Sequence, residues 1–289
     1  MTLLTAWIRG NSTHSQLVVA ADSMLSFGAR WSCCPKIFPL RRNDSVLAFG
    51  GDTKFAYPVL LQLSNSASNY EKALSREIDI SALRTHFIKI IESMHTTVTD
   101  FPSGRHGIDP TDFVIVFAGY SAQAKEFKAW RLFFDKSERK FLHRPLSFHA
   151  TRTKSTKSFL FAGDHVKEAV DLLYEKLTDR KKLTTGTLDM EPLEVLVDMI
   201  ESPEFKSIGG PPQLVKVYSF ANVLPMNVFW PRNHPTCIAH FGRPLLPYEG
   251  SKYACLDLND NSLWSPYEAT KKIQNKNTSA SVVASVRTT

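Results

Sequence analysis

Residues 2–22, TLLTAWIRGNSTHSQLVVAAD, contain two apolar runs with a polar turn between them. Apolar runs this short, separated by Gly, Asn and Ser, predict two strands at 2–9 and 17–21 that are joined as a hairpin. Thr2 directly follows Met1 at the head of the first strand. A β-branched residue suits a strand, but a threonine at this position can also become the first residue of the chain once Met1 is removed.

The rest of the chain alternates groups of strands with pairs of helices. Strands are expected at 35–40, 45–50, 112–120, 126–135, 140–148, 157–163 and 211–223, and helices at 52–66, 78–98, 164–177 and 190–202. Asp52 is the expected N-cap of the first helix, and Pro58 predicts a kink or an early end in it. This order predicts an α/β layered fold made of hairpins, unlike the regular alternation of a doubly wound parallel sheet.

Length and composition predict one large folded unit with additions. The chain has 289 residues, of which 43% are hydrophobic and 11% aromatic, enough to bury a sizeable core. A main domain is expected over 1–222, a C-terminal appendage packed on it over 223–274, and a flexible tail over 275–289. The first stretch lacks a signal-peptide pattern, and no apolar run approaches the ~18 residues of a membrane span. A cytoplasmic protein without membrane contact is therefore expected.

Charge, cysteines and motifs exclude several functions. The 35 basic and 28 acidic residues give a net charge of +7, but the basic runs lack interleaved aromatics, so nucleic-acid binding is a minor alternative. The four cysteines, two of them adjacent at Cys33 and Cys34, are expected to be reduced structural thiols. His165 and Glu168 fit a capped first helical turn better than a metal site. Nucleotide, dinucleotide and zinc-protease motifs are absent, so no cofactor and no metal is expected.

A group of residues near the N-terminus has a recognisable order. Thr2 heads a strand, AADS ends the second strand at Asp22, Gly28 follows six residues later, Lys36 opens the third strand, and FGG enters the first helix at Gly50. Together with the later FAGD and IGGPPQLVKVY, this order resembles the proteasome β-subunit family of N-terminal nucleophile (Ntn) hydrolases over residues 2–220. The resemblance implies a four-layer αββα sandwich.

The resemblance also implies a catalytic set made of Thr2, Asp22, Lys36 and Gly50. After Met1 removal, Thr2 would supply both the hydroxyl nucleophile and a free α-amine, whose pKa of about 7.7–8.0 suits a general base. A nearby Lys36 ammonium would favour the neutral amine, and Asp22 would orient Lys36. Gly50 would donate its backbone N–H to the tetrahedral oxyanion. The expected activity is that of a threonine peptidase or amidase.

The sequence departs from the family at supporting positions. Phe205 and Ile208 stand where the family has Asp and Ser, and Asp164 stands where it has Ser after a glycine. A catalytically silent assembly or regulatory subunit is therefore the alternative to the hydrolase. The expected partners are a peptide or amide substrate and further copies of this chain in a homo-oligomer, and an unfoldase partner would also fit the family.

Overall fold

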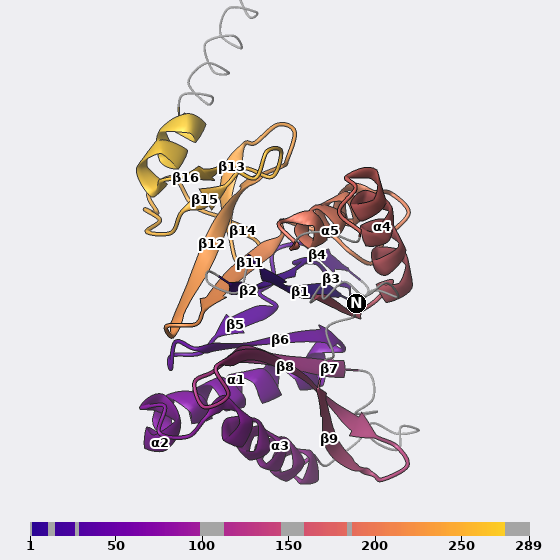
Figure 1. Cartoon of the computed structure of the whole chain (residues 1–289), viewed down its shortest axis with the longest axis vertical. Helices are drawn as coiled ribbons and strands as arrows, with labels where there is room; N and C mark the ends of the chain where they lie inside the picture. The colour runs from indigo at the N-terminus through magenta and orange to yellow at the C-terminus, as the bar shows by residue number, and fades with distance from the viewer. Residues whose placement is uncertain are drawn as a thin grey trace, which may run out of the picture.

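The computed structural model describes residues 2–10, 15–26, 29–98, 113–145, 159–183 and 187–274. The predicted tail over 275–289 lies outside these residues. The chain is a mixed α/β protein, as predicted, and its strands form mainly antiparallel sheets (Figure 1). No helix within the described ranges is both long and apolar enough to cross a lipid bilayer.

The first sheet has the strand order β10-β1-β2-β11-β12-β13-β14, with β15 and β16 added beside β12. Its strands are β1 (Leu3–Arg9), β2 (Gln16–Ala21), β10 (Phe159–Gly163), β11 (Gln213–Tyr218), β12 (Asn222–Trp230), β13 (Cys237–His240), β14 (Arg243–Pro244), β15 (Cys255–Leu256) and β16 (Leu263–Trp264). The predicted N-terminal hairpin is confirmed, because β1 and β2 pair antiparallel with Leu4 opposite Ala21.

The second sheet has the order β5-β6-β7-β8-β9 and is antiparallel throughout. Its strands are β5 (Ile37–Pro39), β6 (Ser45–Gly51), β7 (Phe113–Ser121), β8 (Glu126–Asp135) and β9 (Lys140–Pro145), and a small separate hairpin consists of β3 (Leu25–Ser26) and β4 (Arg30–Trp31). The helices are α1 (Thr53–Asn69), α2 (Glu71–Leu74), α3 (Ile80–Thr96), α4 (Val166–Asp179) and α5 (Glu191–Glu201), and residues 266–274 are also helical.

In both sheets, alternate side chains of a strand pack on opposite faces, one toward helices and the other toward the second sheet. In β1, Leu3 and Trp7 pack in the cluster that includes α4 and α5, whereas Leu4 and Ala6 pack in a cluster shared by strands of both sheets. Strands of the second sheet do the same, with Phe49 packed toward α1 and α3. Successive strand residues point to opposite faces, so strands covered on both faces have continuous apolar runs.

The predicted early end of the first helix at Pro58 is wrong, because α1 continues to Asn69. Pro58 is exposed, so the carbonyl that loses its hydrogen bond there can be hydrated. Phe55, Val59 and Leu63 are buried on the opposite side of α1. Packing of that apolar face stabilises the helix through the proline.

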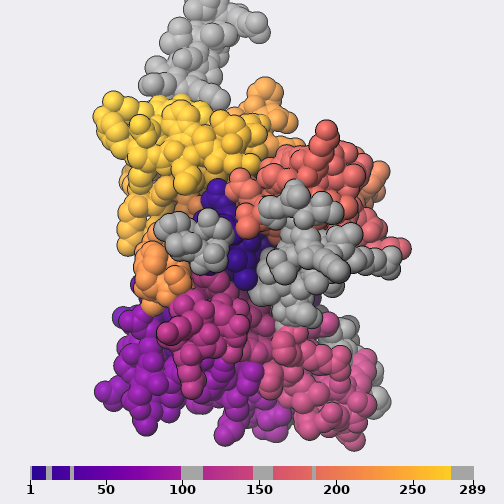
Figure 2. All heavy atoms as spheres, viewed as in Figure 1, coloured from indigo at the N-terminus to yellow at the C-terminus, as the bar shows by residue number. Residues whose placement is uncertain are grey.

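The C-terminal segment continues the first sheet. The predicted boundary between residues 222 and 223 falls inside β12, which pairs with β11 as far as Met226 and then pairs with β13 and β15. Residues beyond β12 cap one end of the molecule, opposite the layer of α1 and α3 (Figure 2). The turn at Phe241 and Gly242 packs back on the main body, where Phe241 contacts the cluster between the two sheets.

Candidate active site

Thr2 stands immediately before β1 and is fully buried. Its N–H donates to Asp164 Oδ2 at 2.7 Å, and its carbonyl accepts from the Asp164 N–H at 2.7 Å. Leu3, the next residue, pairs with Gly163 of β10. The edge between β1 and β10 therefore fixes the position of the Thr2 backbone, with Asp164 as its direct partner.

Asp22 and Lys36 form a fully buried ion pair beside the start of β1, with 2.8 Å between Asp22 Oδ1 and Lys36 Nζ. Asp22 Oδ1 also accepts from the N–H of Leu3, at 3.1 Å. Its other carboxylate oxygen accepts from the N–H groups of Met24 and Gly209. The carboxylate thus ties Lys36 to the backbone next to Thr2.

Burial dominates the electrostatics of this pair. Loss of water raises the pKa of Asp22 and lowers the pKa of Lys36 from their ordinary values. The mutual attraction of the two charges opposes both shifts, and Asp164 adds to the attraction on Lys36. The charged partners Asp22 and Asp164 thus favour the ammonium form of Lys36 against the effect of burial.

Gly50 lies beside Thr2. It is opposite Val114 in the pairing of β6 with β7. A Cβ added to Gly50 would stand 3.7 Å from Thr2 Cβ and 3.5 Å from Gly163 Cα, both ordinary van der Waals distances. Thr2, Asp22, Lys36 and Gly50, the four residues singled out in the sequence, therefore gather in one region of the molecule.

The hydrogen bonds of β6 bear on which glycine can donate to a substrate. The Phe49 N–H donates to the Lys36 carbonyl at 3.2 Å, toward the β5 edge of β6. Neighbouring N–H groups of a strand point to opposite edges. By this alternation, the Gly50 N–H is directed toward β7, and the next N–H on the β5 edge is that of Gly51, whose φ is 99°.

Gln213 is a buried residue of the site that the sequence did not single out. Its Oε1 accepts from the Lys36 N–H at 2.8 Å, and its Nε2 donates to the carbonyls of Asp22 at 3.2 Å and Cys34 at 2.8 Å. The side chain thus links the two segments that hold the ion pair. A glutamine in an apolar strand, QLVKVY, was the available signal, since a buried amide needs polar partners.

The positions at which the sequence departs from the pattern it resembles lie close to one another. The Phe205 ring contacts the His165 ring edge-on, with centroids 5.1 Å apart, and Ile208 is buried in the cluster under α4 and α5. His165 is the N-cap residue of α4 but makes no capping hydrogen bond with its side chain, so the capped turn expected there is absent. Its Nε2 lies 3.2 Å from Ser207 Oγ.

Nothing in the described part of the structure indicates that a cysteine near the site is reactive. All four are free thiols, and Cys34 is buried. Burial raises the pKa of the Cys34 thiol, which disfavours the nucleophilic thiolate. In the part of the chain that the structure describes, no cluster of three or more His, Cys, Asp or Glu side chains could hold a metal ion. Gly28, part of the family-like order, lies outside that part.

No protein-family model matches the chain, and no curated protein is similar enough to count as a match.

Proposed function

We propose that the protein is an Ntn amide-bond hydrolase that uses Thr2 as its nucleophile after Met1 is removed. The observation that carries the proposal is the position of the buried Asp22–Lys36 pair, which is hydrogen-bonded to the backbone directly after Thr2. A buried lysine and aspartate cost solvation free energy. A role in proton transfer at Thr2 accounts for their presence at this point of the fold.

The proposed chemistry proceeds through an ester. The Thr2 hydroxyl attacks the substrate carbonyl carbon while its proton passes to the neutral α-amine. The backbone N–H of Gly51, on the β5 edge of β6, stabilises the oxyanion in place of the Gly50 N–H, and Gly50 leaves room for the substrate carbonyl. The C–N bond then breaks, and the leaving amine takes the proton from the α-ammonium. Water, deprotonated by the α-amine, attacks the ester, and its hydrolysis releases the acid and restores the Thr2 hydroxyl.

The finer description of the fold belongs to this proposal. The two sheets share an apolar cluster, α4 and α5 pack with one sheet, and α1 and α3 pack with the other. This packing is compatible with the four-layer αββα sandwich of Ntn hydrolases. A peptide or amide is the proposed substrate class, and a homo-oligomer is the proposed assembly, with an unfoldase as a further partner that this class of protein would accommodate.

A catalytically silent assembly or regulatory subunit is the second candidate, and Asp164 favours it. With Met1 removed, the Asp164 carboxylate would lie beside an α-ammonium and stabilise the charged form, which cannot accept a proton. Thr2 is also fully buried in the chain that begins at Met1. The two candidates therefore differ in whether removal of Met1 yields a neutral amine and an accessible hydroxyl.

Turnover of a panel of reporter amides by the untagged protein tests the hydrolase. Thr2→Ser keeps a hydroxyl and an N-terminal amine, whereas Thr2→Ala keeps only the amine, and both allow Met1 removal because the second residue stays small. We expect measurable turnover for the wild type and Thr2→Ser, and none for Thr2→Ala. Equal turnover in all three would place the active site elsewhere, and no turnover in any would favour the silent subunit.

A further inference from the structure

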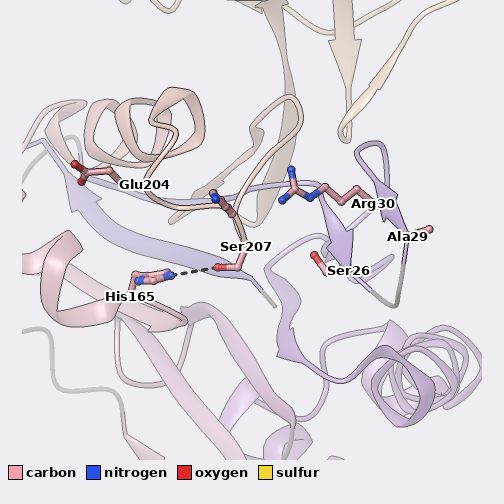
Figure 3. Close-up of a pocket in the computed structure, with 7 residues that line it drawn as sticks. Ser26, Ala29, Arg30, His165, Glu204 and Ser207 are labelled. Carbon is pink, nitrogen blue, oxygen red and sulfur yellow. Dashed lines mark hydrogen bonds between the residues drawn. The ribbon is translucent and has the colours of Figure 1, made fainter.

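A hollow of about 470 Å³ opens between α4, the loop before β11 and the β3–β4 hairpin. It is lined by Ser26, Ala29, Arg30, His165, Glu204, Lys206 and Ser207. Figure 3 shows Arg30 and Ser26 on one side, His165 and Ser207 opposite them, and Glu204 at the far end from Arg30. The volume is large enough for one or two amino-acid residues.

Each wall of the hollow is close in sequence to a residue of the candidate active site. His165 follows Asp164, whose carboxylate accepts from the Thr2 N–H. Ser207 stands two residues before Gly209, whose N–H donates to Asp22. The remaining wall begins at Ser26, in the hairpin that follows Asp22 along the chain. The hollow and the candidate active site are therefore built on the same three segments of the chain.

Cations dominate the charges around the hollow. Arg30 and Lys206 are exposed, and within the described residues neither has a carboxylate within 4.0 Å. Arg180 and Arg232, in contrast, each have an acidic partner. Glu204 is the single acidic residue of the lining, and Figure 3 places it away from Arg30. The Arg30 side of the hollow is thus positive and rich in hydrogen-bond donors.

We propose that this hollow binds an acidic residue of the substrate, adjacent to the amide that Thr2 would cleave, with Arg30 as the main recognition residue. A planar guanidinium can donate two parallel hydrogen bonds to one carboxylate, and a lysine adds a point charge. The hydroxyls of Ser26 and Ser207 provide further donors at the same hollow. The assignment rests on the proposed function, because it treats the hollow as part of the substrate path.

A binding measurement tests the hollow without requiring catalysis. The probes are a short fluorescent peptide with a single glutamate and its twin with glutamine, titrated by anisotropy against the full-length Thr2→Ala variant. We expect the glutamate peptide to bind about tenfold more tightly than its twin, the ratio typical of one charge-assisted contact. Added to that variant, Arg30→Gln should remove the preference, and Arg30→Glu should reverse it toward a lysine peptide.

Arg139→Gln is the matched control, since Arg139 is exposed in the turn before β9, away from the hollow. It should keep the tenfold preference, and thermal unfolding should show that each variant is folded. Equal affinities for the two peptides in the parent variant would overturn the proposal. A preference that survives both Arg30→Gln and Lys206→Gln would also overturn it.

The wild-type protein separates this proposal from the proposed function. Placing the glutamate on either side of the reporter amide shows which side of the cleaved bond the hollow serves, read as the higher kcat/KM. If the Thr2→Ala variant prefers the glutamate peptide but the wild type hydrolyses neither substrate, the hydrolase fails and the acid-binding hollow stands. If hydrolysis occurs with no preference in binding or in rate, the hollow fails and the hydrolase stands.

Discussion

The carboxylate of Asp164 accepts a hydrogen bond of 2.7 Å from the backbone nitrogen of Thr2. In the chain that begins at Met1 this nitrogen belongs to an amide, and after Met1 removal it would be the α-amine of the proposed base. A carboxylate this close favours the ammonium and so raises the pKa of the amine. The Lys36 ammonium acts in the opposite direction. In the proposed hydrolase, the balance between Asp164 and Lys36 would set the pH at which Thr2 becomes active.

Asp164→Asn should therefore shift the pH profile of activity. The asparagine is isosteric and uncharged, so the amine becomes neutral at lower pH, and the rising limb of kcat/KM should move down by about one pH unit. The measurement is the pH–rate profile of the two proteins on the same reporter amide. A rising limb that stays in place, with both proteins folded, would show that the Thr2 amine does not titrate in the active state.

Removal of both charges of the Lys36–Asp22 pair should cost less stability than removal of Lys36 alone, but it should not restore catalysis. Lys36→Met leaves the Asp22 carboxylate buried without its cation, so we expect a loss of about 3–5 kcal/mol in the free energy of unfolding. The double variant Lys36→Met, Asp22→Asn removes both charges and should recover much of that loss. Denaturant unfolding measures the stability of each variant.

Labelling of Thr2 by an electrophilic peptide, expected in the wild type, should be absent both in Lys36→Met and in the double variant. Restored folding without restored labelling separates the catalytic contribution of the pair from its structural one. Labelling at the wild-type rate in the folded double variant would remove Lys36 from the mechanism.

Gly50→Ala should lower the rate with little effect on stability. The added methyl would make only ordinary contacts, yet it would stand 3.7 Å from Thr2 Cβ, where the substrate carbonyl must approach. Alanine keeps the backbone N–H, so the loss would come from obstruction of the substrate carbonyl, and we expect turnover to fall by a factor on the order of 10², as for a misplacement of about 1 Å. Reporter turnover and melting temperature are measured together.

Gly119→Ala is the comparison variant, because a methyl there would lie 2.6 Å from Ser45 Cβ and force the backbone to move. It should lower the melting temperature more than Gly50→Ala does. Unchanged turnover in Gly50→Ala would mean that the space beside Gly50 is not on the reaction path.

The buried Lys216 should lower the free energy of unfolding by an amount that depends on pH. It is buried in β11, and burial, together with the nearby charge of Arg9, lowers its pKa to about 8. Below pH 8 the folded protein must bury an ammonium, whereas between about 8 and 10.5 only the unfolded chain keeps the proton. Lys216→Met should therefore be the more stable protein at pH 7, by up to about 3 kcal/mol.

This advantage should shrink as the pH rises from 8 toward 10.5. Chemical denaturation of both proteins at several pH values gives the difference in unfolding free energy directly. Lys167→Met, at an exposed position of α4, should show no such trend. A constant difference across the pH range for Lys216→Met would mean that the lysine is not buried as a cation.

Gly242 should be required for the C-terminal segment to pack against the candidate active site. Its φ is 83°, and a Cβ there would overlap Ser23, next to Asp22. Gly242→Ala should therefore displace the turn and lower both the melting temperature and the rate of Thr2 labelling. Gly250→Ala is its control, because a Cβ at Gly250 meets no atom within 4 Å. Equal labelling in both variants would show that the C-terminal segment does not support the site.

Local patterns predicted the elements because their physical causes are local. The short apolar runs of the N-terminal hairpin, the Asp52 N-cap and the apolar face of α3 are set by neighbours in the sequence. The predicted helix at 78–98 corresponds to Ile80–Thr96 in the structure. The early end predicted at Pro58 was wrong, because continuation of the helix there depends on which face of α1 is packed.

Contacts between distant residues could not be predicted from local patterns. The hydrogen bonds of Gln213 to Lys36 and Asp22, and that of Asp164 to Thr2, join segments separated by more than 150 residues. The path of β12 into a second set of strand partners likewise depends on pairing at both of its ends. The order of residues near the N-terminus predicted that Thr2, Asp22, Lys36 and Gly50 lie together, but it did not predict that Gln213 and Asp164 hydrogen-bond to them.

Covalent labelling of untagged protein by a peptide β-lactone, read by intact mass and peptide mapping, tests the central proposal most directly. The hydrolase predicts a protein that lacks Met1 and carries one acyl group on Thr2, formed when the hydroxyl opens the lactone, and predicts no adduct on the Thr2→Ala variant. Folded protein that lacks Met1 and gains no adduct on Thr2, or an equal adduct on the wild type and Thr2→Ala, would contradict it.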